Sequence, residues 1–480
     1  MLGGIDHITD SLSDAAITFA QTITTRAKGQ TAPLANLKAV AWAGKTDFTT
    51  GLARERALHM DLRASGQSRA LRHAFFAERA VAKPAVIKGI TPREILHIAV
   101  VGGGLMGAGI AAACLAGGFT VTMIERDQDA VKAGAGRVKT LIDGALQRGK
   151  ISGDKHGAQL ARFMASDCYD AASSADLAIE AVFEDLAVKH DVFKSLAGVM
   201  SKNAILATNT SYLDPREIFE GIADLSRCVG LHFFSPAHIM KLLEIVNTPD
   251  TAPQVLATSF AFGKKLHKIS VLAGICDGFI GNRMLSAYRR QADYLLADGC
   301  LPYEIDAAMR AFGMPMGPYE LQDLTGLQIA WTNRKRNAKT RDLAERYIPI
   351  GDQLCEMGRL GQHAGKGWYS YADGSRKPIR DPEVEALIDA ILPRQKFTRD
   401  EITNRMLAAL INEGALIVEQ GIAERPLDVD MVQIHGYGFP RWRGGPMQYA
   451  REIGVDKIAQ WMGKVSEQSP GSWKISKYLA

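Results

Sequence analysis

The stretch that most constrains the fold of this chain is residues 96–127. Its first part, residues 97–101, is a short apolar run rich in branched side chains, which predicts a buried strand. Residues 102–107 then read Gly-x-Gly-x-x-Gly, and residues 106–116 are mostly small, which predicts a helix that lies close on a sheet. A second apolar run, 119–124, predicts the next strand. This succession of strand, glycine turn, helix and strand predicts a dinucleotide-binding fold.

The preferred cofactor follows from the glycines and from the residue after the second strand. Glycines at these positions let the backbone approach a pyrophosphate at the N-terminus of the next helix. Glu125 stands 21 positions after Gly104, where a carboxylate can accept hydrogen bonds from a ribose and would repel a 2′-phosphate. The sequence therefore predicts NAD rather than NADP, and Arg126 beside the acid is the residue that leaves NADP open.

Composition is typical of a globular enzyme with several domains. The chain has 480 residues, enough for three domains of ordinary size, with 47% hydrophobic and 23% charged residues. No apolar run approaches the ~18 residues that a membrane span needs, and the N-terminus lacks the pattern of a secretory signal. The sequence thus predicts a cytoplasmic protein without a membrane segment.

Cysteines and charges argue against metal and nucleic acid as partners. The six cysteines are scattered, with no Cys-x-x-Cys pair and no histidines at metal-ligand spacing, which predicts reduced thiols and no metal site. The net charge of +5 resides in residues 1–97, which carry 13 Lys and Arg against 8 Asp and Glu. Solvated helix faces explain this excess most simply, and attraction of a phosphate-bearing substrate is the alternative. No basic run is interleaved with aromatic residues, so nucleic acid is not expected.

Strands and helices continue to alternate beyond residue 127, as a doubly wound sheet requires. Further strands are expected at 177–181, 204–208, 229–234 and 241–246. Polar side chains stand at or just after the ends of these strands, where open α/β sheets place their ligand crevice. They are Glu180, Glu184, Asp185, Asn209, Thr210, Ser211 and His232.

Beyond about residue 276 the pattern becomes helical and contains an internal repeat. The sequence Asn-Arg-Met-Leu occurs at Asn282 and again at Asn404, and each copy has a glycine 17 positions after its asparagine. Two copies of a helical unit that bury their faces against each other are the simplest explanation. The expected domains are a helical N-terminal segment with a linker over 1–95, a Rossmann domain over 96–275, and two helical domains over 276–395 and 396–480.

The N-terminal segment shows helical patterns but no series of strands. Helices are expected over 15–25 and 63–79, and the segment between them, with Pro33 and several glycines, reads as looser. This region is expected to be an appendage rather than a complete domain.

Two histidines are candidates for a catalytic base. Oxidation of an alcohol needs a group that removes the hydroxyl proton, and histidine suits this near neutral pH. His232 ends a predicted strand and is followed by two phenylalanines. Glu244 comes 12 positions later on the returning strand, from which a carboxylate could fix the tautomer of the ring. His238 lies six residues beyond His232, and the pattern alone does not choose between them.

Six segments together resemble a known family. They are residues 101–110, 180–189 (EAVFEDLAVK), 208–213 (TNTSYL), 230–244 (GLHFFSPAHIMKLLE), 278–285 (GFIGNRML) and 365–369 (GKGWY). The chain resembles the L-3-hydroxyacyl-CoA dehydrogenase family, in particular the dehydrogenase half of the multifunctional fatty-acid β-oxidation enzymes. The resemblance implies a Rossmann-type doubly wound sheet followed by two tandem all-α domains. The helical N-terminal appendage resembles the end of a crotonase-type hydratase at residues 3–8 and 63–79.

What the resemblance implies is NAD-dependent oxidation of L-3-hydroxyacyl-CoA to 3-ketoacyl-CoA in β-oxidation. It makes His232 the catalytic base and Glu244 its orienting carboxylate, and it places Ser211 and Asn282 against the substrate. Tyr212 stands where a small residue is more usual, which implies an altered acyl pocket. The glycine motif and the resemblance together give as cofactor contacts Gly102, Gly104, Leu105, Met106, Gly107, Glu125, Arg126, Glu184, Lys189 and Asn209.

The expected partner is the acyl-CoA substrate. The duplicated helical half implies a monomer with an internal pseudo-dimer, or else a homodimer, and no hydratase activity is expected because most of that domain is missing. Two other interpretations remain. One is a dehydrogenase of sugar nucleotides or hydroxy acids, for which Cys276 would be the candidate thiol. The other is a non-catalytic protein that kept the fold.

Overall fold

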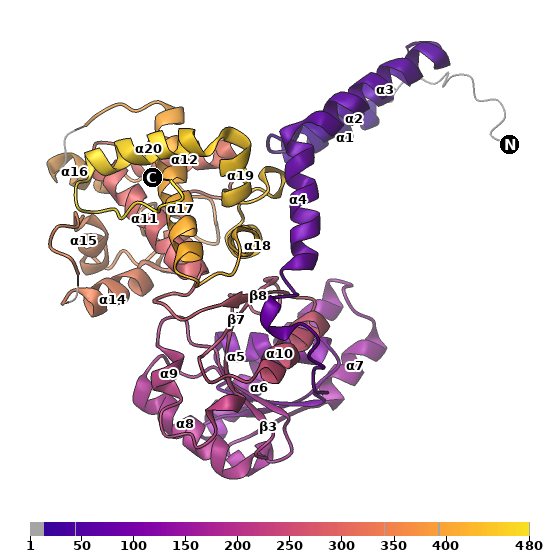
Figure 1. Ribbon diagram of the computed structural model, residues 1–480, viewed down its shortest axis with the longest axis vertical. Helices are drawn as coiled ribbons and strands as arrows, with labels where there is room; N and C mark the ends of the chain where they lie inside the picture. The colour runs from indigo at the N-terminus through magenta and orange to yellow at the C-terminus, as the bar shows by residue number, and fades with distance from the viewer. Residues whose placement is uncertain (1–13, 44, 340, 392–393, 480) are drawn as a thin grey trace. The chain divides into compact units, whose positions relative to one another are not determined.

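The computed structural model describes residues 14–43, 45–339, 341–391 and 394–479. These residues form two compact units (Figure 1). The sheet unit comprises residues 75–284 and 417–437, and the helical unit comprises the remaining described residues. The chain passes between the units three times within helices: α4 (Gly66–Ala80), α11 (Gly281–Ala297) and α17 (Arg399–Glu419).

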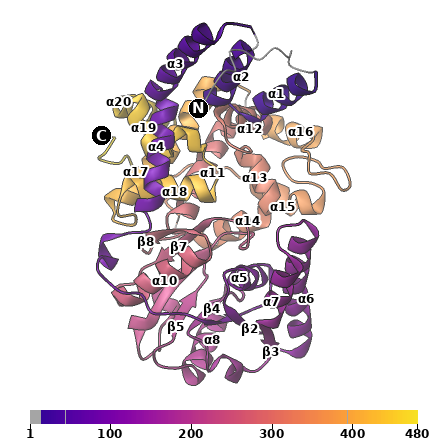
Figure 2. The same ribbon diagram turned by 90° about the vertical axis from the view of Figure 1, so that its right-hand side faces the viewer.

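An eight-stranded sheet is the centre of the sheet unit. Its strands are β1 (His97–Val101), β2 (Thr120–Ile124), β3 (Phe163–Ser166), β4 (Leu177–Glu180), β5 (Ile205–Thr208), β6 (Cys228–Phe233), β7 (Leu242–Val246) and β8 (Ile269–Ala273). Their order is β3-β2-β1-β4-β5-β6-β7-β8, and only the β6–β7 pair is antiparallel. Strands β2, β3, β4, β5, β7 and β8 are labelled in Figure 2. The chain reverses its direction of progress across the sheet between β1 and β4, and such a switch point opens a ligand crevice at the carboxyl ends of the strands.

Helices cover both faces of this sheet, which is the doubly wound arrangement that the sequence predicted. One core packs α5 (Leu105–Ala116), α6 (Gln128–Gln147) and α10 (Pro253–Lys265) on the first face. The other core packs α8 (Leu186–Val199) and α9 (Pro215–Ile218) on the opposite face. The remaining elements are α7 (Gly153–Ala161), η1 (Ala85–Ile87), η2 (Tyr169–Ala172) and η3 (Leu225–Arg227).

Two of the eight strands were not anticipated from the sequence. β3 has four residues, pairs only with β2 at the edge of the sheet, and is largely half-exposed. Its apolar run, 163–165, is shorter than the ~4 residues that mark a buried strand. β8 pairs with β7 and adds a second short strand just before the helical half begins. The other six strands lie where they were predicted, within one or two residues.

The same succession of four helices occurs twice in the second half of the chain. The first set is α11, α12 (Pro302–Phe312), α13 (Pro318–Thr325) and α14 (Leu327–Asn337), and the second is α17, α18 (Pro426–Gly436), α19 (Pro446–Ile453) and α20 (Val455–Gln468). A proline occupies the first turn of both the second and the third helix in each set. Helices α15 (Ile350–Glu356) and α16 (Pro382–Ile391) and the short η4 (Gln362–Ala364) and η5 (Arg441–Arg443) complete this half.

The two copies contact each other inside the helical unit. The Phe312 ring of the first copy packs edge-on against Phe439 and Tyr449 of the second, at 5.6 and 5.3 Å between ring centroids. Helix α18 of the second copy belongs instead to the sheet unit, where it packs on β7 and β8. The second copy thus contributes to both units. The domain limits at residues 95, 275 and 395 remain predictions.

The N-terminal segment corrects two expectations. Helices α2 (Thr31–Ala43) and α3 (Phe48–Ala64) fill the stretch that was predicted to be loose, between α1 (Asp14–Arg26) and α4. Pro33 is tolerated because it is the third residue of α2, a position where a backbone N–H would have no acceptor within the helix, so the missing donor costs no hydrogen bond. The helix predicted over 63–79 is in fact broken at Ser65, whose extended backbone ends α3. The hydratase-like residues 3–8 lie outside the described residues.

No helix in the described part of the chain combines the length and apolar character that crossing a membrane requires. The same residues contain no group of three or more His, Cys, Asp or Glu side chains placed to hold a metal ion.

Candidate active site

The glycine turn between β1 and α5 forms an open cradle. Gly102 has a φ of +98°, and a Cβ there would lie 2.7 Å from the Ala181 carbonyl oxygen, just after β4. A Cβ on Gly107 would lie 1.8 Å from the Gly102 carbonyl oxygen, so the turn and the helix approach each other as closely as backbone allows. A Cβ on Gly104 would meet nothing within 4 Å. The turn is therefore closely packed at Gly102 and Gly107 and open at Gly104. An open backbone turn at the N-terminus of α5 suits a pyrophosphate.

Glu125, directly after β2, turns its carboxylate toward this loop. Its Oε1 accepts a hydrogen bond from the Gly103 N–H at 2.5 Å, and its Oε2 accepts one from the Arg126 N–H at 3.2 Å. The Arg126 side chain is exposed and pairs with Asp127, at 3.0 Å between Nε and Oδ2. The Glu125 carboxylate is thus fixed beside the glycine loop. Arg126, the residue that kept NADP as an alternative cofactor, pairs with Asp127. Sequence reasoning missed Arg137, which donates to the Gly103 carbonyl at 3.0 Å.

His232 and Glu244 face each other across the antiparallel strands β6 and β7. His232 Nδ1 lies 2.8 Å from Glu244 Oε2, and the second carboxylate oxygen accepts a hydrogen bond from the Gly281 N–H at 2.9 Å. Both side chains are buried, with the imidazole against Phe234 and Phe279 at 4.4 and 5.6 Å between ring centroids. We call His232, Glu244 and the Gly281 amide the histidine cluster. A carboxylate can only accept a hydrogen bond, so the ring proton is on Nδ1. The basic lone pair of the ring is therefore at Nε2.

The environment of His238 differs from that of His232. Its Nδ1 is buried and has no hydrogen-bond partner among the described residues. Burial and the positive charge of Lys268 lower the pKa of His238, with smaller contributions from Arg148 and Lys150. Of the two candidates, His232 alone has the carboxylate partner that the spacing predicted.

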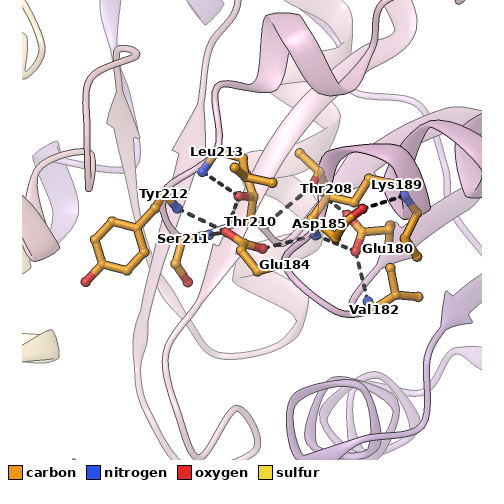
Figure 3. A network of polar contacts seen from close by, with 11 residues as sticks. Glu180, Val182, Glu184, Asp185, Lys189, Thr208, Thr210, Ser211, Tyr212 and Leu213 are labelled. Atoms are coloured by element: carbon orange, nitrogen blue, oxygen red, sulfur yellow. Dashed lines mark hydrogen bonds and ion pairs between the residues drawn. The ribbon is translucent and has the colours of Figure 1, made fainter. Parts of the chain in front are cut away.

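Lys189 and its acidic neighbours form a second cluster at the ends of β4 and β5 (Figure 3). Lys189 Nζ lies 2.7 Å from Glu180 Oε1 and 3.2 Å from Glu184 Oε2, and its side chain is 1% exposed. Glu180 also accepts hydrogen bonds from the Thr208 hydroxyl and the Val182 N–H, at 2.7 and 2.8 Å. The two carboxylates therefore share the single ammonium of Lys189. We call Glu180, Glu184, Lys189, Thr208 and Thr210 the lysine cluster.

Glu184, a member of the lysine cluster, holds the loop that contains Ser211. Its Oε1 accepts from the Thr210 hydroxyl at 2.5 Å and from the Ser211 and Tyr212 N–H groups at 2.9 and 3.2 Å (Figure 3). Burial alone would raise the pKa of Glu184, but the Lys189 charge and these hydrogen bonds outweigh it and hold the pKa below its usual value. The position of Ser211 is therefore set by an ionised Glu184.

Asn209 joins this loop to the histidine cluster. Its backbone N–H donates to the Glu180 carbonyl at 2.9 Å, and its side-chain Oδ1 accepts from the Phe233 N–H at 2.8 Å. The sequence placed Asn209 among the cofactor contacts, and the structure places it between the ends of β4 and β6. Its role toward the cofactor remains a prediction, as do those of Lys189 and Arg126.

Comparisons with known proteins bear on this arrangement. Residues 97–276 match the 3-hydroxyacyl-CoA dehydrogenase NAD-binding domain, and residues 278–371 and 402–478 match the 3-hydroxyacyl-CoA dehydrogenase C-terminal domain. The peroxisomal bifunctional enzyme of Danio rerio is 39% identical over 463 residues, which are 91% of this chain and 63% of that protein. The solved dehydrogenase part of multifunctional enzyme 1 from C. elegans is 27% identical with a TM-score of 0.65, covering 85% of this chain and 96% of that one. The (S)-3-hydroxybutyryl-CoA dehydrogenase PaaH1 from Ralstonia eutropha is 30% identical with a TM-score of 0.55, covering 58% of this chain and all of that one.

The chain belongs to the 3-hydroxyacyl-CoA dehydrogenase family. Its residues 97–276 are the NAD-binding domain of that family. The C-terminal domain of the family matches twice, over the two helical copies that the sequence repeat predicted. The chain spans about 63% of the length of the curated relatives that it matches. Those relatives are named as peroxisomal proteins, so the cytoplasmic location expected from the sequence remains a prediction.

Within this family member, Tyr437 is a site neighbour that sequence reasoning did not find. Its hydroxyl donates to Asn282 Oδ1 at 2.8 Å, although 155 residues separate the two in sequence. Asn282 itself lies in the first turn of α11, next to the Gly281 amide that Glu244 binds. No local pattern at Tyr437 indicated this contact, because it depends on how the second helical copy packs on the sheet.

Proposed function

We propose that this chain catalyses NAD-dependent oxidation of an L-3-hydroxyacyl-CoA to the 3-ketoacyl-CoA, as a step of fatty-acid β-oxidation. The observation that carries the proposal is the buried His232–Glu244 pair in a chain that also has the open glycine cradle. Membership of the 3-hydroxyacyl-CoA dehydrogenase family supports the choice of substrate class.

His232 acts as the general base. Its Nε2 accepts the proton of the substrate 3-hydroxyl, while the Nδ1 proton stays hydrogen-bonded to Glu244. The Glu244 carboxylate then stabilises the imidazolium that forms. The chemistry that bound NAD supplies is acceptance of the hydride released from carbon 3, which leaves a carbonyl there. Phe234 and Phe279 flank the ring and limit the access of water during the transfer.

The residues proposed to hold NAD and the acyl-CoA substrate follow from the family resemblance and from where the side chains lie in the structure. Gly102, Gly104 and Gly107 with the N-terminus of α5 receive the pyrophosphate, and Glu125 receives the adenine-side ribose. Ser211 and Asn282 contact the substrate, with Ser211 carried on the loop that Glu184 holds.

A thiol mechanism has less support. Cys276 Sγ contacts the Phe279 carbonyl oxygen at 3.1 Å, and burial raises the pKa of this thiol. A raised pKa reduces the fraction of thiolate, which is the nucleophilic form. We therefore propose no catalytic role for Cys276.

The test is NADH formation, followed by absorbance, with purified protein and L-3-hydroxyacyl-CoAs of several chain lengths. Turnover with the L-isomers and a strong preference for NAD over NADP are expected, because Glu125 would repel a 2′-phosphate. The D-isomers serve as the control. Absence of NADH formation with every chain length would reject the proposal.

A further inference from the structure

Asn282 is held from two sides by groups that belong to different parts of the sequence. On its backbone side, the preceding Gly281 N–H donates to Glu244, the carboxylate that also binds His232. On its side-chain side, Oδ1 accepts a hydrogen bond from the Tyr437 hydroxyl at 2.8 Å. A continuous chain of contacts therefore runs from His232 through Glu244, Gly281 and Asn282 to Tyr437, all within the sheet unit.

Tyr437 is itself fixed by the packing of the second helical copy. It is the residue after α18, which packs on β7 and β8. The preceding Gly436 lies so close to the sheet that a Cβ there would come within 2.5 Å of Leu242 Cδ2. The Tyr437 ring also packs edge-on against Phe234, at 5.8 Å between ring centroids. The Tyr437 ring is thus held by the packing of α18 on the sheet and by its contact with Phe234.

The Tyr437 ring occupies the space that a side chain at position 281 would need. A Cβ on Gly281 would lie 2.6 Å from the Tyr437 hydroxyl oxygen and 2.7 Å from its Cε2. A side chain at position 281 would therefore push the tyrosine away from Asn282. Glycine at this position allows the tyrosine and the asparagine to meet.

We infer that Tyr437 is a positioning residue for the dehydrogenation proposed above, and that it acts through Asn282. An asparagine amide carries its oxygen and its NH₂ group on opposite sides of the same carbon. Because the tyrosine hydroxyl donates to Oδ1, it fixes the amide with the NH₂ side turned away from the ring. This orientation makes Asn282 a hydrogen-bond donor toward an oxygen of the acyl substrate. The second helical copy thereby contributes to the reaction and does more than pack against the first.

The inference rests on the proposed function, and the experiment separates the two. Steady-state kinetics compare wild type, Tyr437→Phe, Asn282→Ala and the double variant Asn282→Ala/Tyr437→Phe. Phenylalanine keeps the ring packing on Phe234 and removes only the hydroxyl. We expect kcat to fall about 2- to 12-fold in Tyr437→Phe, the range for loss of one hydrogen bond, with the KM for NAD unchanged. In the Asn282→Ala background the same change should have no further effect on kcat.

Independent losses in the double variant, or a Tyr437→Phe enzyme with wild-type kcat, would overturn the inference while leaving the proposed function intact. Gly281→Ala is the second variant, because its added Cβ should displace the tyrosine from Asn282 and lower kcat at least as much as Tyr437→Phe does. Tyr449→Phe is the matched control, since it removes a tyrosine hydroxyl of the second copy in the helical unit, against Phe312, and should change kcat by less than about 2-fold.

A second readout does not depend on activity. In protein labelled with ¹⁵N-asparagine, the side-chain NH₂ signals of Asn282, assigned as those absent from Asn282→Ala, should shift in Tyr437→Phe and stay in place in Tyr449→Phe. Unchanged signals in Tyr437→Phe would reject the positioning role even if the wild-type protein oxidised no hydroxyacyl-CoA. Thermal unfolding of each variant establishes that the compared proteins are folded.

Discussion

The histidine cluster and the lysine cluster lie on neighbouring parts of one sheet but use a carboxylate in different ways. Glu244 divides its two oxygens between one ring nitrogen and one backbone amide, and aromatic rings surround the pair. Glu180 and Glu184 instead share the single buried ammonium of Lys189, and their remaining oxygens bind hydroxyl and backbone groups. The first arrangement leaves a basic nitrogen available for proton transfer. The second pairs its carboxylates with an ammonium, hydroxyls and backbone amides, so it stabilises the strand ends and holds a loop.

The comparison predicts that loss of a group has its largest effect on turnover in the histidine cluster. His232→Ala should lower kcat by about 10³- to 10⁴-fold, the upper range for a general base, while the affinity for NAD stays near the wild-type value. Stopped-flow measurement of NADH formation and a separate NAD titration check the two parts. His238→Ala is the control, because that ring lacks a carboxylate partner, and it should keep most of the activity. The opposite result, an inactive His238→Ala and an active His232→Ala, would reverse the assignment.

In the lysine cluster the largest effect should be on stability. Lys189→Met removes the only ammonium from a buried ion pair and leaves Glu180 uncompensated, which should lower the free energy of unfolding by roughly 3–5 kcal/mol. Urea unfolding measures this loss. Adding Glu180→Gln to Lys189→Met should recover part of it, because the uncompensated charge is then absent.

A lysine on the exposed face of the same helix provides the control. Lys194→Met in α8 should change the free energy of unfolding by less than about 0.5 kcal/mol. If Lys189→Met and Lys194→Met lowered the free energy of unfolding equally, the buried ion pair would contribute no more to stability than an exposed lysine does.

The sequence predicted the two clusters unequally, and the reason is physical. His232 and Glu244 stand on consecutive strands, and an antiparallel return brings residues 12 positions apart into register, so their contact could be expected from spacing. Lys189 lies on an amphipathic helix, where a lysine usually points to solvent, and its burial depends on Glu180 at the end of another strand. Helical or strand periodicity carries no information on such a pairing.

Contacts between distant segments were the least predictable part of the fold. The edge strand β3 has only a short apolar run, and Tyr437 reaches Asn282 only because α18 packs on the sheet. By contrast, the glycine turn after β1 was predictable because its residues are selected by local backbone geometry. The sequence therefore specified the cofactor cradle and the candidate base well, and the groups that support them poorly.

After His232→Ala, Glu244→Gln should have the next largest effect on kcat. It tests whether the carboxylate of the histidine cluster acts on the ring. A glutamine offers one acceptor oxygen where the structure needs two, for His232 Nδ1 and for the Gly281 N–H. It also removes the charge that stabilises the imidazolium. We expect kcat to fall about 10²-fold, with a smaller change in the KM for NAD. Single-turnover NADH formation isolates the chemical step, and a wild-type rate in this variant would show that the carboxylate does not act on the ring.

The smallest predicted effect concerns the pH dependence of the lysine cluster through Glu184. Its pKa in the folded protein is lowered, because the Lys189 charge and the hydrogen bonds outweigh the opposing effect of burial. A lowered pKa stabilises the folded state fully above the ordinary glutamate pKa of about 4.3, and this stabilisation is lost as the pH falls through the folded value. Because the Glu184 side chain is 36% exposed, solvent screening limits the contribution to about 1 kcal/mol or less.

Urea unfolding of wild type and Glu184→Gln at pH 7 and at pH 4 measures this contribution. The wild-type protein should be the more stable of the two at pH 7, and the difference should shrink at pH 4, where Glu184 begins to take up a proton. Glu217→Gln, which removes the carboxylate of a glutamate of α9 outside the lysine cluster, is the control. A difference between wild type and Glu184→Gln that grew toward acid pH would mean that the carboxylate is destabilised in the folded state. The loop that carries Ser211 would then have to be held by the Thr208 and Thr210 hydroxyls rather than by the ionised acid.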